Sequence, residues 1–153
     1  MKKNIDNFFP FIIMIIGIIV TAMLFLPALS FPDSDSSFLG YEVVFGTEFV
    51  NLGSFASGEI VWSILGVIAY ISPLIGGLLV LYFRKSTFTS MALFTVGAVL
   101  LFTLPSYTKT TVTLLGTVTE INIDWVVSYG LIIAGVLSAV GAFLCLFKFI
   151  YKK

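Results

Sequence analysis

The sequence predicts an all-α integral membrane protein: an up-down-up-down four-helix transmembrane bundle with a small extracellular β element. Of its 153 residues, 59% are hydrophobic and 10% are charged, whereas a soluble globular domain has about 25% charged residues. The apolar residues fall into four runs of about 20 residues, each long enough to cross a hydrocarbon core of about 30 Å. Most of the basic residues flank those ends of the runs that four spans place on one side of the membrane. We therefore expect residues 1–153 to form a single membrane domain.

The four spans are expected at about residues 8–29, 60–83, 88–105 and 125–147, with outer loops over residues 30–59 and 106–124. Pro27 and Pro32 end the first helix, because proline cannot continue a helical hydrogen-bond pattern. Only Ser86 and Thr87 separate the second span from the third, and so short a turn makes these helices antiparallel neighbours. Four spans also place both chain termini on the same side of the membrane.

Residues that can cap a helix precede three of the four spans. The expected N-caps are Asp6 or Asn7 for the first span, Ser57 for the second, and Asn122 or Asp124 for the fourth. Pro10 then falls in the first turn of its helix, where the missing N–H costs nothing. Glu59 falls in the first turn of the second helix, where a negative charge interacts favourably with the helix dipole.

The first span has a second interpretation, a cleaved secretory signal peptide. The residues Ala28-Leu29-Ser30 resemble a cleavage site. The apolar run, however, is longer than the roughly 7–15 residues that are typical of a signal peptide. Cleavage would leave the orientation of the other three helices unchanged.

The positive-inside rule sets the orientation from Lys and Arg alone. Seven of the eight basic residues would share one side, namely Lys2, Lys3, Arg84, Lys85, Lys148, Lys152 and Lys153. The other side would hold Lys109 and seven of the eight acidic residues. We therefore expect both termini to be cytoplasmic and the two outer loops to be external. The absence of cysteines and glycosylation acceptors from these loops favours a bacterial cell membrane.

Both outer loops have the composition of β-strands. Residues 38–50 are rich in aromatic and β-branched side chains around Gly46-Thr47, which predicts a short hairpin. Residues 110–121 have the same character, with a break at Gly116. Because an isolated hairpin is marginally stable in water, we expect the two loops to combine into one small sheet over the bundle.

Small residues and a proline inside the spans predict where the helices pack, since small side chains let two helices approach closely. The candidates are Gly17 and Thr21 in the first span, Pro73, Gly76 and Gly77 in the second, and Gly130, Ala134, Ser138 and Gly141 in the fourth. The stripe in the fourth span fits an internal seam or a dimerisation face. Pro73 fits a kink tolerated inside a bundle, or a broken helix whose carbonyls bind an ion or substrate.

Several kinds of chemistry find no support in the sequence, and we expect no catalytic residue, cofactor or metal. The chain has no His, which is the commonest general base and metal ligand. No ionisable residue lies in the inner part of a span, which argues against ion-coupled transport. Residues 33–37 begin like a calcium loop, but Phe38 and Val44 stand where that loop needs Gly and Glu. The basic clusters are short and adjoin the membrane, so nucleic acid is not an expected partner.

Four spans with a long, strand-forming first outer loop resemble the layout of the claudin-like tetraspan proteins. The resemblance is in layout only. That family carries Gly-Leu-Trp followed by two cysteines in this loop, whereas Gly40-Tyr41-Glu42 is the nearest match here and no Cys follows it in the loop. The resemblance carries over no functional residue and no role.

The expected function is that of a non-enzymatic multi-pass membrane protein. In the lipid bilayer it would present an acidic outer surface to a membrane-protein partner, as an accessory subunit or as a homo-oligomer. The expected interaction residues are Asp33, Asp35, Tyr41, Glu42, Phe45, Glu48 and Glu120. The alternative is a small oligomeric transporter or channel that uses the Pro73 region. A lipid-acting enzyme would have only Glu59, Asp124, Tyr107 and Tyr129 as outer catalytic groups.

Overall fold

The computed structural model describes residues 2–32, 35–53, 55–83 and 86–151. Its helices are α1 (Lys2–Ala22), α2 (Gly40–Phe45), α3 (Ile64–Tyr82), α4 (Thr87–Tyr107) and α5 (Tyr129–Tyr151), with a short 3-10 helix η1 (Met23–Phe25). Its strands are β1 (Pro27–Ser30), β2 (Ser37–Leu39), β3 (Thr47–Asn51), β4 (Ala56–Ile60), β5 (Thr110–Leu114), β6 (Thr117–Ile121) and β7 (Val126–Val127). The chain is 62% helix and 21% strand, so the expected all-α class is wrong and the protein mixes helix with sheet.

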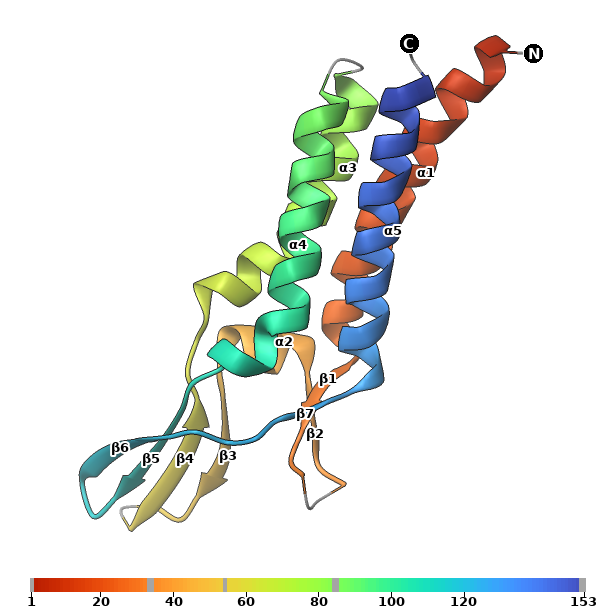
Figure 1. Ribbon diagram of the computed structural model, residues 1–153. Coiled ribbons are helices and arrows are strands. Elements are labelled where there is room, and N and C mark those ends of the chain that lie inside the picture. Colours follow the sequence, from red (N-terminus) through yellow and green to blue (C-terminus); the bar gives the residue numbers. More distant parts are fainter. Residues whose placement is uncertain (1, 33–34, 54, 84–85, 152–153) are drawn as a thin grey trace.

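The four long helices pack side by side, and each runs opposite to the long helix before it (Figure 1). α1 and α4 each pack against both α3 and α5. All four are long and apolar enough to cross a membrane, and even the shortest of them, α3, is about 28 Å long at 1.5 Å per residue. The start of α1, the end of α5 and the adjoining ends of α3 and α4 lie at one end of the bundle, the termini end (Figure 1). α2 and both sheets lie at the other, the sheet end.

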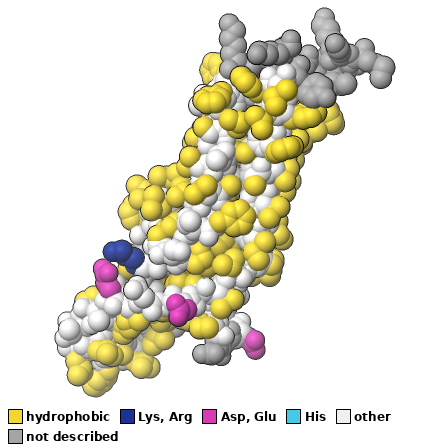
Figure 2. Space-filling view, in the orientation of Figure 1, with side chains coloured by type: hydrophobic (Ala, Val, Ile, Leu, Met, Phe, Trp, Pro, Cys, Tyr) yellow, Lys and Arg dark blue, Asp and Glu magenta, His cyan; other side chains and the backbone are white. Residues whose placement is uncertain are grey.

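Apolar side chains fill the interior of the bundle, and they also cover much of its outer surface on the face that Figure 2 shows. Phe11, Ile71, Val99 and Phe143 are among the large apolar side chains that stay exposed on the helices. A continuous apolar surface of this size is unfavourable in water and is compatible with a multi-pass membrane protein. On the face that Figure 2 shows, the coloured acidic and basic side chains all lie at the sheet end.

The helix at the N-terminus differs at both ends from the expected span of residues 8–29. α1 already begins at Lys2, so the expected N-cap at Asp6 or Asn7 is wrong and Pro10 lies inside the helix. At the other end, η1 follows Ala22 and Pro27 opens β1. β1 pairs with β2 on one side and β7 on the other, so strand pairing replaces helical hydrogen bonds over these residues.

The expected N-caps of the second and fourth spans are also wrong, because strands precede both helices. Ser57 and Glu59 lie in β4, which is paired on both sides by β3 and β5. The N-cap of α3 is Ser63, whose hydroxyl oxygen accepts a hydrogen bond from the Gly66 N–H at 3.3 Å. Asn122 and Asp124 precede β7, and α5 begins only afterwards.

The first outer loop contains a helix where a hairpin over residues 38–50 was expected. Within it, the Leu39 N–H donates to Glu42 Oε2 at 2.8 Å and so caps the start of α2. Gly46 ends α2 with a φ of 85°, a conformation that glycine adopts easily. Val43 and Val44 are the buried valines of α2, and their burial explains how a β-prone sequence is held as a helix.

The strands form two sheets rather than the single sheet expected. The larger has the order β3-β4-β5-β6 and combines hairpins from both outer loops, which confirms that the loops pair and that the second hairpin turns beside Gly116. The smaller has the order β2-β1-β7 and joins the end of α1 to the start of α5. This second sheet was not expected from the sequence.

Candidate functional site

One face of the four-stranded sheet carries a row of acidic side chains. The strand register aligns Glu48 with Glu59, Glu59 with Thr111, and Thr111 with Glu120. Cross-strand partners in an antiparallel sheet point to the same face. We call these four residues, Glu48, Glu59, Thr111 and Glu120, the acidic row.

The polar partners of the acidic row leave it with a net negative charge. Asn51 donates through Nδ2 to Glu48 Oε2 at 2.9 Å, and the Thr111 hydroxyl donates to Glu59 Oε1 at 3.1 Å. Lys109 Nζ lies 3.7 Å from Glu120 Oε2, and both side chains are well exposed to solvent. An exposed ion pair of this kind is weak. Within the described residues, no group of three or more acidic, Cys or His side chains could hold a metal ion.

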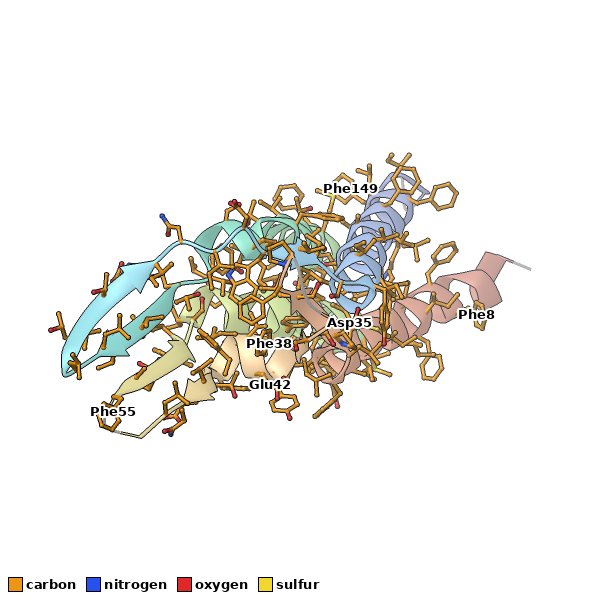
Figure 3. The ribbon with its side chains drawn as sticks, turned by 90° about the horizontal axis from the view of Figure 1, so that it is seen from below. Phe8, Asp35, Phe38, Glu42, Phe55 and Phe149 are labelled. Carbon is orange, nitrogen blue, oxygen red and sulfur yellow. The ribbon has the colours of Figure 1, made fainter. Side chains whose placement is uncertain are left out.

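The opposite face of this sheet is more apolar and is anchored to the bundle end. Ile60 is buried there, and the Phe49 ring lies so close to Gly58 that a Cβ at that glycine would be 2.6 Å from it. Phe49 also meets Phe31 edge-on, with ring centroids 5.5 Å apart, and Phe31 stacks on Trp125 at 5.1 Å. Together with Phe38, which Figure 3 labels at the lower end of the bundle, these rings form an aromatic cluster that connects the two sheets.

The far end of the sheet is apolar and uncovered. Phe55 is 70% exposed and Leu115 is 79% exposed, and Figure 3 shows Phe55 at the end of the sheet that lies away from the bundle. The Leu115 N–H donates to the Phe55 carbonyl at 3.0 Å, so the two hairpin turns lie side by side.

The expected interaction residues that the structure describes lie in three separate places. Asp33 lies outside the described residues, and Asp35 is exposed at the β1–β2 connection. Tyr41, Glu42 and Phe45 belong to α2, where Glu42 is occupied with the cap of its own helix. Only Glu48 and Glu120 come together, in the acidic row.

Glu59 and Thr111 complete the acidic row, although neither was among the residues expected at the interaction surface. Glu59 was assigned to a helix start, although Ser57 and Glu59 alternate with Ala56, Gly58 and Ile60. Such alternation of polar with small or apolar residues is the signal of a half-buried strand. Recognising it would have placed Glu59 on a polar sheet face.

The packing candidates around Pro73 lie in close contacts between helices. A Cβ at Gly17 would be 2.6 Å from the Pro73 carbonyl oxygen, and one at Gly97 would be 2.7 Å from the Pro73 ring. Gly77 faces the backbone of Met14 in the same way. The Thr21 hydroxyl donates to the Tyr70 carbonyl at 2.9 Å. α1 and α4 therefore enclose the proline from two sides.

The small-residue stripe of α5 faces other parts of the same chain. Ser138 Oγ donates to the Phe94 carbonyl at 2.9 Å, and a Cβ at Gly141 would be 2.5 Å from the Phe94 ring. Ala134 is fully buried, and a Cβ at Gly130 would be 2.5 Å from the Pro27 carbonyl oxygen. These four residues therefore pack inside the chain, against α4 and β1.

An apolar groove of about 320 Å³ lies between α4 and α5, lined by residues that include Met91, Phe102 and Phe143. The Thr95 hydroxyl in its wall already donates to the Met91 carbonyl at 2.9 Å. The groove therefore offers little polar chemistry, and the acidic row is the better candidate site. A comparison of the chain with protein-family models, curated proteins and solved structures finds no match.

Proposed function

We propose that this chain is a non-enzymatic multi-pass membrane protein that binds a basic protein partner through the acidic row. The observation that carries the proposal is the direct alignment of Glu48 with Glu59 across two strands. Like charges in directly opposite positions of neighbouring strands destabilise a sheet. A positively charged partner would remove this repulsion and complement the potential of the face.

The proposed orientation places the sheet end outside the cell and both termini in the cytoplasm. Its support is the distribution of Lys and Arg, of which Lys109 alone belongs to the loops at the sheet end. The positive-inside rule assigns the other end to the cytoplasm. In this orientation the acidic row is available to an external domain of another envelope protein, and the chain would act as an accessory subunit.

Paired substitutions with matched charge test the proposal. Glu48→Gln with Glu59→Gln removes the opposed pair, whereas Asp35→Asn with Asp124→Asn removes two exposed acids outside the row. Proteins cross-linked to each variant in native membranes are purified and quantified. We expect the first variant alone to lose a partner that high salt also releases from the wild type. Equal partner sets for both variants would contradict the proposal.

The transporter alternative has no comparable support. It would need space for a solute or ion beside Pro73, where α1 and α4 approach closely at Gly17 and Gly97. The helix-packing contacts therefore favour the tolerated kink over the broken helix.

A further inference from the structure

β6 is an open edge of the four-stranded sheet, since the sheet order ends with this strand. All five of its residues are exposed. We infer that β6 receives an extended segment of the partner as a fifth strand, an inference that rests on the proposed function and names its contact surface. Addition of a strand to an open sheet edge is a common mode of recognition, in which backbone hydrogen bonds provide affinity.

The two edges of this sheet differ in how they are protected. Proteins usually protect an edge strand with a bulge, a proline, a lysine or a covering segment. β3, the other edge, has an irregular register between Glu48 and Val50, and the Phe49 ring packs into the aromatic cluster. β6 pairs in unbroken register with β5 and contains neither Pro nor Lys. Its free side is therefore a regular, accessible template.

The register identifies which backbone groups are open. Leu114 pairs with Thr117 across the two-residue turn Leu115-Gly116. The pair that flanks such a turn exchanges both backbone hydrogen bonds, and bonded and non-bonded pairs alternate from there. Val118 and Glu120 are consequently non-bonded positions toward β5, and their N–H and C=O groups point to the open side.

The side chains along β6 specify the chemistry of the incoming segment. Glu120 ends the acidic row, so a residue beside it on the same face is best basic. On the other face Ile121 aligns with Thr110, and Thr110 with Ile60, so neighbouring positions of the segment are best apolar. Because successive residues of a strand point to opposite faces, the segment would alternate apolar and basic residues.

A second copy of the chain fits this edge poorly. β6 has Glu120 as its only charge, so self-pairing would bring no basic residue to the acidic row. The strands run away from the bundle (Figure 1), so antiparallel pairing of two β6 edges would point the two bundles in opposite directions. Helices of both copies could not then occupy one membrane.

A labelled peptide, Thr-Val-Lys-Val-Lys-Val-Thr, provides the probe, with the full-length protein in a non-ionic detergent micelle. Its binding is measured by fluorescence anisotropy. Val118→Pro removes an open N–H and places a ring on the open side, whereas Val118→Thr keeps the N–H. We expect Val118→Pro to weaken binding about tenfold or more and Val118→Thr to change it less than about twofold.

A second peptide makes the test independent of the variant's folding. It carries the same side chains but is N-methylated at its internal residues, so it keeps both charges and cannot form the backbone ladder. The inference predicts that it binds wild-type protein about tenfold more weakly or worse. The inference would be overturned if wild-type protein bound the two peptides equally well. It would also be overturned if Val118→Pro and Val118→Thr bound the first peptide equally well while both retained the thermal unfolding temperature of the wild type.

Two further results separate this inference from the proposed function. In one result, the double variant Glu48→Gln with Glu59→Gln loses its partner in membranes while Val118→Pro keeps it. The proposed role of the acidic row would then be supported, and the inference that β6 receives a strand would be wrong. A disulfide-linked dimer formed through Val118→Cys would identify a second copy as the occupant and would also overturn the inference.

Discussion

Gly17 shows how closely the bundle depends on single residues. A Cβ at this position would lie 2.6 Å from the Pro73 carbonyl oxygen, and a backbone atom cannot move aside as the end of a side chain can. The four-residue spacing of Gly17 and Thr21 predicted a close helix approach, and these residues do face α3. Sequence could not indicate that Pro73 is the contact, because the pairing of two distant helices is set by the whole bundle.

Gly17→Ala should separate α1 from α3 and lower the free energy of unfolding by about 1–3 kcal/mol, the usual cost of overpacking. Denaturation of the purified protein in mixed detergent micelles measures the change. Val99→Ala, on an exposed face of α4, is the control and should stay within about 0.5 kcal/mol of wild type. Equal stability of Gly17→Ala and wild type would show that the α1–α3 contact is looser than described.

Two hydroxyls, one on α1 and one on α3, should respond in opposite ways when they are removed. Tyr70 Oη is buried without a hydrogen-bond partner in the described residues, so Tyr70→Phe should leave stability unchanged or raise it. The Thr21 hydroxyl donates a hydrogen bond to the Tyr70 carbonyl, so Thr21→Val should lower the free energy of unfolding by about 0.5–1.5 kcal/mol. The same denaturation assay compares them, and a larger loss for Tyr70→Phe than for Thr21→Val would reverse the assignment.

The turn between β5 and β6 holds a leucine in a backbone conformation that suits glycine or asparagine better. Leu115 has a φ of 49° and is followed by Gly116 at 84°. Two consecutive positive φ angles are typical of the hairpin turn that favours Asn-Gly. Leu115 is poorly suited to this conformation because its Cβ approaches the following carbonyl.

Leu115→Asn should therefore stabilise the hairpin by about 1 kcal/mol, and slower amide hydrogen exchange in β5 and β6 would register the gain. Leu52→Asn is the matched control, since Leu52 is also an exposed leucine beside a hairpin turn and has no positive φ. Exchange in Leu115→Asn that is as fast as in Leu52→Asn would contradict this account of the turn.

The elements that the sequence predicted well are those with a local signal. The hairpin follows from Gly116 between two β-prone segments, and the four helices follow from the length of their apolar runs. Each of these signals lies within one segment of the chain. β4 and α2 were missed because their conformation depends on distant partners. β4 is a strand between β3 and β5, and α2 buries Val43 and Val44 despite their strand propensity.

At the scale of the whole molecule, the two ends of the bundle have different charges. The described acids at the sheet end are Asp35, Glu42, Glu48, Glu59, Glu120 and Asp124, and Lys109 is the described basic residue there. The sequence predicted this asymmetry, because it follows from the order of spans. The acidic row could not be predicted in the same way, since its alignment requires the register of four strands from two loops.

The aromatic cluster of Phe31, Phe38, Phe49 and Trp125 fixes the sheet that carries this charge to the bundle. Its members come from both outer loops and from both sheets. The sheet that carries the acidic row is therefore held at the end of the bundle opposite the termini (Figure 1).

Cysteine labelling in intact cells tests the central claim that the sheet end faces outward. Cys145 is the only native cysteine and is buried, so Cys145→Ala provides a background for Leu115→Cys at the sheet tip and Ser86→Cys at the termini end. A membrane-impermeant maleimide should label Leu115→Cys in intact cells and Ser86→Cys only after permeabilisation. Labelling of Ser86→Cys in intact cells, with Leu115→Cys protected, would contradict the account.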